Sequence, residues 1–173
     1  MRIPVYDPQV EDDKRQSKKE RILNRPVDGE TPVYSIGTIA RMLGVSVQTL
    51  RMYEREQLIV SYKGLNGQRL YSDSDIKRLE CIRKAITEQK LGIQGIKHIH
   101  AFIPCWQIRG CSGNEREHCQ AYRGSKQGCW GYPHTDDFCA TQKCRECEVY
   151  RIAVNCEDIK AAIIGLSQQR DLV

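Results

Sequence analysis

Seven of the nine cysteines lie within 43 residues, between Cys105 and Cys147. The same segment contains five glycines and shows neither the 3.6-residue period of an amphipathic helix nor the alternation of a strand. Such a segment buries little apolar surface, so it needs a bound cofactor or cross-links to hold a shape. We therefore predict an irregular cofactor-binding module over residues 105–148.

The thiols of this module are expected to be reduced. The chain contains no run of eighteen apolar residues, so the sequence predicts no membrane span. Its start, Met1-Arg2-Ile3-Pro4, lacks the apolar core of a secretory signal. These observations predict a cytoplasmic location, where disulfides are rare. The cysteines then indicate metal or redox chemistry rather than a disulfide framework.

Thiolate is a soft ligand that selects iron–sulfur clusters, zinc or copper(I). The Cys-x4-Cys-x2-Cys spacing that ends the segment occurs in plant-type ferredoxin clusters, although its surroundings here differ. We predict an iron–sulfur cluster of the 4Fe-4S type; zinc is the alternative, with His118 or His134 as an added ligand, and a metal-free thiol switch is the third interpretation. The candidate ligands are Cys105, Cys111, Cys119, Cys129, Cys139, Cys144 and Cys147.

Positive charge is confined to the segment before the cysteines. Residues 31–104 contain eleven basic and six acidic side chains, which accounts for the whole net charge of +5. A polyanion partner is therefore expected to bind there. Residues 1–30 are polar and balanced in charge, and we predict that they form a flexible arm.

Local signals in residues 31–104 predict two short helices joined by a glycine turn. Ser35 is an N-cap candidate before apolar residues at helical spacing, Gly44 interrupts that pattern, and Ser46 is a second N-cap candidate. The segments 58–62 and 68–71 flank a glycine-rich turn and predict a β-hairpin.

Two further helices are expected after the hairpin. Ser72 begins a capping-box pattern, and apolar residues at helical spacing continue to Ile86. Another helix is predicted from Ile93 to Ile103. The order helix, turn, helix, hairpin, helix, helix is typical of a winged helix-turn-helix.

A winged helix binds B-DNA through two elements. The second helix enters the major groove, and the hairpin contacts the neighbouring backbone. Gln48 and Thr49 are placed for base contacts. The predicted phosphate contacts are Arg51, Tyr53, Lys63, Arg69 and Tyr71. A four-helix domain that binds protein would share the amphipathic helices, but the localised positive charge and the wing favour double-stranded DNA.

Several stretches resemble the MerR family of bacterial regulators. Residues 34–45 are similar to its first helix and turn, Thr49-Leu50-Arg51-Met52-Tyr53-Glu54-Arg55-Glu56 to its recognition helix, and Arg69-Leu70-Tyr71 to its wing. Residues 93–97 are similar to the heat-shock-repressor branch of the family. Two departures are Met52, where tyrosine is usual, and Gln57, where glycine is usual. The resemblance implies a transcription regulator that binds an inverted-repeat operator as a homodimer, with RNA polymerase as a further candidate partner.

The cysteine-rich segment has its own resemblance. The pairs Cys105-Trp106 and Cys129-Trp130, together with Cys144-x-x-Cys147-x-x-Tyr150, are similar to the two-CW domain, a small bacterial module. This resemblance leaves the cofactor open. Another branch of the MerR family senses oxidants through an iron–sulfur cluster, which by analogy implies a redox or metal sensor here.

The last segment, residues 149–173, predicts a dimerisation helix. Apolar residues alternate at spacings of three and four, which is the pattern of a coiled-coil seam. The seam positions are Val149, Ile152, Cys156, Ile159, Ile163 and Leu166. The predicted fold is thus mainly α: a winged helix-turn-helix with a small hairpin wing, an irregular cysteine-rich module and a C-terminal dimerisation helix. No Cys/His/Asp arrangement at a recognisable spacing predicts an enzyme.

Overall fold

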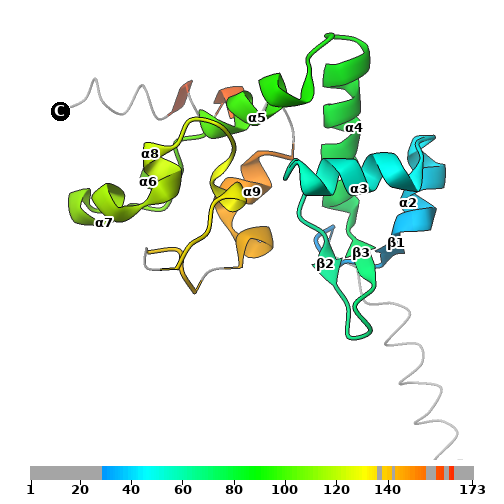
Figure 1. Ribbon diagram of the computed structural model, residues 1–173, viewed down its shortest axis with the longest axis horizontal. Helices are drawn as coiled ribbons and strands as arrows, with labels where there is room; N and C mark the ends of the chain where they lie inside the picture. The colour runs from blue at the N-terminus through cyan, green and yellow to red at the C-terminus, as the bar shows by residue number, and fades with distance from the viewer. Residues whose placement is uncertain (1–28, 136–137, 142, 155–158, 162–163, 166–173) are drawn as a thin grey trace, which may run out of the picture.

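The computed structural model describes residues 29–135, 138–141, 143–154, 159–161 and 164–165. Figure 1 shows an elongated arrangement in which residues 34–87 lie at one side, residues 105–123 at the other, and residues 148–152 between them. The described residues are mainly helical, with one small antiparallel sheet, which confirms the predicted fold class. None of the described helices is long and apolar enough to cross a membrane. The predicted N-terminal arm lies almost entirely outside the described residues.

The first two helices form the predicted helix-turn-helix. They are α2 (Ile36–Leu43) and α3 (Val47–Arg55), and each begins after a serine that caps it. The hydroxyls of Ser35 and Ser46 accept a backbone N–H from the third residue of their helix, a donor with no partner inside the helix. Gly44 ends α2 at a φ of 61°, a left-handed conformation that glycine adopts without steric cost.

Removing the N-cap of α3 is expected to lower the stability of the protein. Replacing Ser46 by alanine removes the hydroxyl that accepts the Thr49 N–H at 3.0 Å. Losing an N-cap hydroxyl costs about 1 kcal/mol, so we expect the free energy of unfolding in urea to fall by that amount. Ser125 is an exposed serine outside any helix, and Ser125→Ala is the matched control. An equal loss in both variants would contradict a role for the cap.

A three-stranded antiparallel sheet follows the helix-turn-helix. Its strands are β1 (Tyr34–Ser35), β2 (Tyr62–Lys63) and β3 (Arg69–Tyr71), in the order β1-β3-β2. The β2–β3 pair is the predicted hairpin, with Tyr62 opposite Leu70. β1 was not predicted, because two residues are too few to show the alternation of a strand.

The hairpin begins four residues later than predicted. Leu58 and Ile59 belong to the core, with exposed fractions of 0% and 1%, and they do not pair in the sheet. The apolar run that suggested a strand is therefore a buried connection between α3 and β2. We call residues 57–60 the connector.

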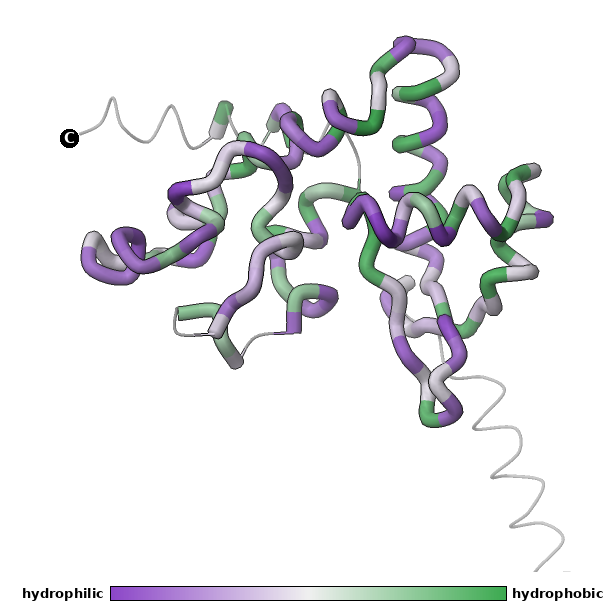
Figure 2. The backbone as a smooth tube through the Cα atoms, in the orientation of Figure 1, coloured by the Kyte–Doolittle hydropathy of each residue, from purple (hydrophilic) through white to green (hydrophobic). Residues whose placement is uncertain are grey.

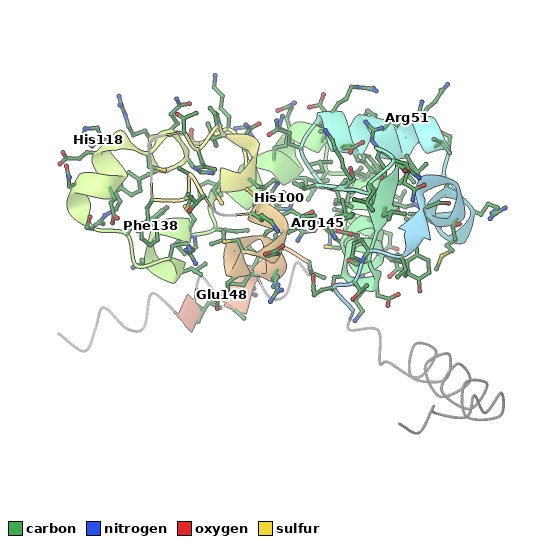
Figure 3. All side chains as sticks on the ribbon, turned by 90° about the horizontal axis from the view of Figure 1, so that it is seen from below. Arg51, His100, His118, Phe138, Arg145 and Glu148 are labelled. Atoms are coloured by element: carbon green, nitrogen blue, oxygen red, sulfur yellow. The ribbon has the colours of Figure 1, made fainter. Side chains whose placement is uncertain are left out.

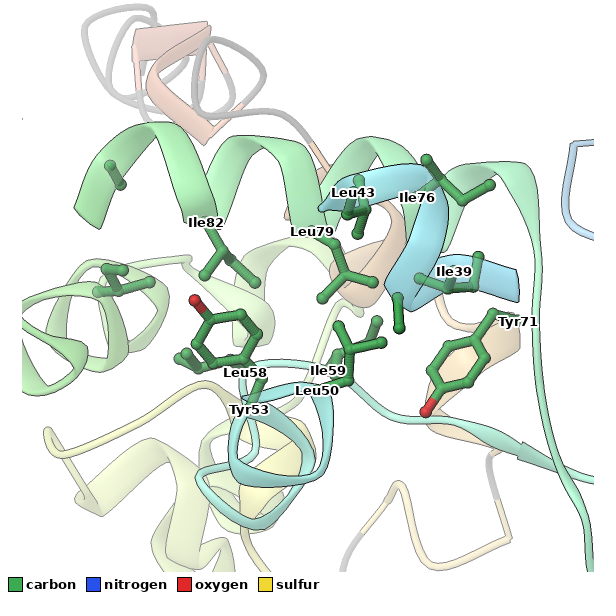
Figure 4. Close-up of a cluster of buried hydrophobic side chains, with 13 residues drawn as sticks. Ile39, Leu43, Leu50, Tyr53, Leu58, Ile59, Tyr71, Ile76, Leu79 and Ile82 are labelled. Carbon is green, nitrogen blue, oxygen red and sulfur yellow. The ribbon is translucent and has the colours of Figure 1, made fainter. Parts of the chain in front are cut away.

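Two further helices complete the winged-helix unit, residues 34–102. They are α4 (Asp73–Thr87), which begins with the predicted capping box between Ser72 and Asp75, and α5 (Ile93–Ala101). Along α4 the hydropathy alternates with the turns of the helix, and its apolar face covers the helix-turn-helix (Figures 2 and 4). The core of this unit includes Ile39, Leu43, Leu50, Tyr53, Leu58, Ile59, Tyr71, Ile76, Leu79 and Ile82.

The cysteine-rich module contains only short helical segments. These are α6 (Cys105–Ile108), α7 (Gly113–His118), α8 (Gln120–Arg123), and the 3-10 turns η1 (Cys129–Gly131) and η2 (Cys144–Glu146). α7 was not predicted, although a local signal exists: Ser112 and Glu115 form a capping box in which each side chain accepts the other's backbone N–H.

The helix after the module differs from the prediction. α9 spans only Glu148–Ile152, so the structure does not show one continuous helix from residue 149 onward. Val149 and Ile159 are 1% and 4% exposed within the chain itself, in one apolar cluster with Trp130. These two seam positions are therefore not free to form the predicted dimer contact, and α9 packs with the module. The seam positions Cys156, Ile163 and Leu166 lie outside the described residues.

Candidate nucleic-acid interface and metal centre

Helix α3 presents the predicted base-contacting residues on its first turn. Gln48 is exposed and Thr49 is half-buried, with the Thr49 hydroxyl 2.8 Å from that of the cap residue Ser46. Arg51 is exposed one turn later and extends from α3 away from the rest of the chain (Figure 3). The N-terminal half of α3 therefore offers amide, hydroxyl and guanidinium groups on one exposed helix.

The wing is tied to α3 by a carboxylate. Glu54, near the end of α3, accepts hydrogen bonds from Arg69 of β3 at 2.5 Å and from Ser61, just before β2. Lys63 of β2 is exposed and free to reach outward. Arg69 retains 42% exposure of its side chain while it bonds to Glu54, so it braces the wing and still presents part of its charge to solvent.

Two of the predicted phosphate contacts are core residues. Tyr71 is 0% exposed, and its hydroxyl is buried with no hydrogen-bond partner among the described residues. Burial raises the pKa of Tyr71 to about 12. Tyr53 is 5% exposed and packs in the same cluster. The prediction is therefore wrong for these two side chains, because a sequence pattern does not distinguish a tyrosine on the DNA side of a helix or strand from one on the core side.

The seven predicted cysteine ligands line two adjoining cavities. The first, of about 30 Å³, has Cys105, Cys111 and Cys119 in its lining, beside residues that it shares with the second and others that include Arg109, Glu115 and Arg116. The second, of about 20 Å³, is lined by Cys144, Trp130 and Tyr150 and by the shared residues. The side chains common to both cavities are Cys129, His134, Cys139 and Cys147. The fold thus gathers seven thiols that are up to 42 positions apart in the sequence.

One pair of thiols is in direct contact. Cys129 donates a hydrogen bond to the sulfur of Cys105, and this bond lowers the pKa of Cys105. The same bond, together with burial, raises the pKa of Cys129. Such a pair favours one thiolate beside one thiol, and the thiolate is the form of cysteine that binds a soft metal ion.

The donor set fits a metal better than it fits an organic ligand. Seven thiols and an imidazole are the ligands that zinc and iron–sulfur centres use, and each cavity has room for no more than about two water-sized guests. Among the described residues no three such side chains are already close enough to hold a metal ion, so the thiols would have to draw together on binding. His134 donates through Nε2 to the Cys129 carbonyl oxygen at 2.9 Å, while His118 lies at the far end of α7 (Figure 3).

The module is attached to the winged-helix unit by a buried ion pair. Arg145, in η2, forms two hydrogen bonds with the carboxylate of Asp75 in α4, at 2.6 and 3.0 Å. The side chains of Arg145 and Asp75 are 15% and 3% exposed. Asp75 also accepts the backbone N–H of Ser72, so this one carboxylate both caps α4 and binds the module.

A second buried cation lies at the same junction. Arg78 of α4 is 1% exposed, donates to the backbone carbonyl of Tyr150, and stacks with its guanidinium carbon 3.6 Å from the centre of the Tyr150 ring. Trp130 packs edge-on against Tyr150, with 5.2 Å between the ring centres. The sequence alone does not single out Arg78 or Arg145. Both partners of each contact are more than 65 residues apart, and no local pattern predicts such contacts.

Comparison with known proteins places the winged-helix unit in a family. The model of the MerR HTH family of regulatory proteins matches residues 34–102. The chain is 34% identical over 70 residues to the heat shock protein HspR of Streptomyces coelicolor, which is 40% of this chain and 46% of that protein. It is 41% identical over 54 residues to the HTH-type transcriptional regulator ZntR of Escherichia coli, which is 31% of this chain and 38% of that protein. For the HTH-type transcriptional regulator TnrA of Bacillus subtilis the identity is 40% over 47 residues, which is 27% of this chain and 43% of that protein.

The similarity covers only part of each protein. The chain spans less than half the length of the curated relatives it matches. The family match ends at residue 102, before the first cysteine of the module. No solved structure matches the chain. The match does include the capped helix pair, the wing and both supporting helices. Residues 34–102 are therefore a helix-turn-helix domain of the MerR family of regulatory proteins.

Proposed function

We propose that this chain is a DNA-binding transcription regulator whose cysteine-rich module responds to a metal or to redox state. The observation that supports DNA binding best is the exposed basic surface made by α3 and the wing, with Gln48, Arg51, Lys63 and Arg69 on elements held together by Glu54. A helix of this width fits the major groove, and a basic wing fits the adjacent phosphates. The named relatives, two of which are transcriptional regulators, support the same role.

Replacing Arg51 by alanine tests this surface. If Arg51 contacts a phosphate, its loss weakens binding to all duplex sequences about equally and makes the slope of log affinity against log salt less negative by about one. We expect this result in fluorescence-anisotropy titrations of a mixed-sequence duplex at several salt concentrations. Lys126→Ala removes the same charge from an exposed position in the module and is the matched control. Equal effects of the two substitutions would contradict the proposed surface.

The regulator is proposed to act as a homodimer on an inverted repeat, with RNA polymerase as a further partner. Two helix-turn-helix heads related by a twofold axis match two half-sites of a palindrome. The burial of Val149 and Ile159 inside the chain means that the dimer contact is not the predicted seam as a whole. Exposed apolar residues of α5 and its end, Ile99 and Phe102, are available for contacts elsewhere.

The module is proposed to hold a thiolate-bound metal centre. Thiolates with an imidazole nearby are a usual donor set for zinc, which is the first candidate, and a 4Fe-4S cluster is the alternative. Protein isolated without oxygen and analysed for zinc, iron and sulfide distinguishes the two. We expect a colourless protein with stoichiometric zinc. A brown protein with thiolate-to-iron absorption and equal iron and sulfide would establish the cluster instead, and protein lacking all three would contradict a metal centre.

A further inference from the structure

Three backbone groups of the connector between α3 and the wing are hydrogen-bonded to side chains of the module and of α9. The carbonyl of Gln57 accepts the indole N–H of Trp130 at 2.8 Å. The N–H of Val60 donates to the Tyr150 hydroxyl at 2.8 Å, and the Val60 carbonyl accepts from Arg145. Buried backbone groups are nearly always paired in native proteins, and here the partners come from side chains 73 to 90 residues further along the chain.

Each of these three residues lies close in sequence to a cysteine of the cavities. Trp130 follows Cys129, and Arg145 follows Cys144. Tyr150 lies in the first turn of α9, a helix whose N-cap residue is Cys147. Trp130 and Tyr150 also line the second cavity beside those cysteines. Any movement that draws the thiols together therefore moves the donors and the acceptor that hold the connector.

The connector is also the point at which α3 and the wing diverge. Gln57, two residues after the end of α3, has a φ of 58°, a left-handed conformation that is strained for a residue with a side chain. The chain continues through Leu58 and Ile59 to β2. A Cβ added at Gly131 would lie 2.2 Å from the Gln57 side-chain oxygen, so the turn after Trp130 sits directly on Gln57. A shift of this turn would change the angle at which α3 leads into the wing.

We propose that Trp130, Arg145 and Tyr150 are positioning residues that transmit the state of the cysteine cavities to the connector within one protomer. This inference rests on the proposed function and adds the path by which the cysteine cavities would affect DNA binding. Metal binding at the thiols changes the relative placement of α3 and the wing, and with it the affinity for DNA. Coupling of this kind typically changes an affinity between about fivefold and 150-fold.

The test uses the full-length, reduced, metal-free protein and cadmium(II) as the thiolate probe. Cadmium–thiolate bonds absorb in the ultraviolet, which gives the stoichiometry of binding. The DNA dissociation constant is then measured with and without bound cadmium. For the unmodified protein we expect these two dissociation constants to differ by a factor of at least about five, which we call the ratio. Trp130→Phe and Tyr150→Phe each keep a ring in place and remove one connector hydrogen bond; both should bind the same amount of cadmium with a ratio close to one.

Trp106→Phe is the matched control. Trp106 also follows a cysteine of the cavities, but its ring packs edge-on against Tyr122 and makes no hydrogen bond to the connector. This variant should keep the ratio of the unmodified protein. The exchange rate of the Val60 amide hydrogen gives a second measurement: cadmium should change it in the unmodified protein and in Trp106→Phe, but not in Tyr150→Phe.

The outcomes separate the two proposals. If the unmodified protein binds DNA and cadmium but its DNA affinity does not respond to cadmium, the coupling is wrong while DNA binding stands. A ratio that survives in both Trp130→Phe and Tyr150→Phe overturns the route through the connector. Absence of the cadmium–thiolate band also overturns it, because the thiols then do not draw together on an ion. Failure of the unmodified protein to bind duplex DNA overturns the proposed function itself.

Discussion

Replacing Arg145 by methionine is expected to lower the free energy of unfolding by about 3 to 5 kcal/mol, because it leaves the carboxylate of Asp75 buried without its partner charge. Asp75 is 3% exposed on its side chain and receives two hydrogen bonds from the guanidinium. Methionine keeps most of the volume of the aliphatic stem. The loss is measured by urea denaturation, with tryptophan fluorescence reporting on the module and circular dichroism on the helices.

A neighbouring pair provides the control for this prediction. Lys143 and Glu146 are 3.3 Å apart, but their side chains are 79% and 61% exposed. Lys143→Met should therefore change stability by less than about 0.5 kcal/mol. Because the cost in Arg145→Met comes from a stranded charge, adding Asp75→Asn should restore part of it. A loss below about 1 kcal/mol in Arg145→Met would contradict the proposed role of the ion pair.

Acidification from pH 7 to pH 5 is expected to destabilise the metal-free protein through His100. This side chain is 5% exposed, and its ring lies 5.1 Å from that of Trp130. Burial, and then the charge of Arg78, lowers the pKa of His100 to about 3. The folded protein thus keeps His100 neutral, whereas the unfolded chain takes up a proton near pH 6.5.

The direction follows from this difference. Stability due to the neutral ring is complete above pH 6.5 and is lost as the pH falls from 6.5 towards 3. Between pH 7 and pH 5 the loss is about 2 kcal/mol, in a range where carboxylates of ordinary pKa remain ionised. Urea midpoints across this range measure it. His100→Gln should remove the dependence, and His98→Gln, on the exposed side of the same helix, should keep it. A flat profile for the unmodified protein would refute the prediction.

The predictions from sequence succeeded where the signal is local. Ser35, Ser46 and Ser72 each cap a helix at the expected residue, since a cap is decided within four residues of the chain. The glycine-rich turn gave the hairpin for the same reason. The missed capping box at Ser112 was equally local, and the absence of an apolar period around it concealed the short helix.

Features that depend on distant partners were not predictable in this way. Nothing near Tyr71 in the sequence indicates that its face of β3 is turned to the core rather than to a ligand. The roles of Arg145 and Tyr150 depend on groups 70 to 90 residues away. The described seam positions Val149, Ile152 and Ile159 lie in one apolar cluster, but periodicity alone does not state whether a stripe is covered by the same chain or by a second copy.

The connector has a consequence for the order in which the protein can mature. During synthesis residues 34–102 are made before Trp130, Arg145 and Tyr150, so Gln57 and Val60 at first lack these hydrogen-bond partners. Contacts separated by so many residues also form late in folding. A nascent or truncated chain that ends after residue 102 would possess every residue of the DNA-binding surface. It would still lack the hydrogen bonds that fix the angle between α3 and the wing. The hydrogen bonds of the connector are therefore complete only after the cysteine-rich module and α9 have been made and folded.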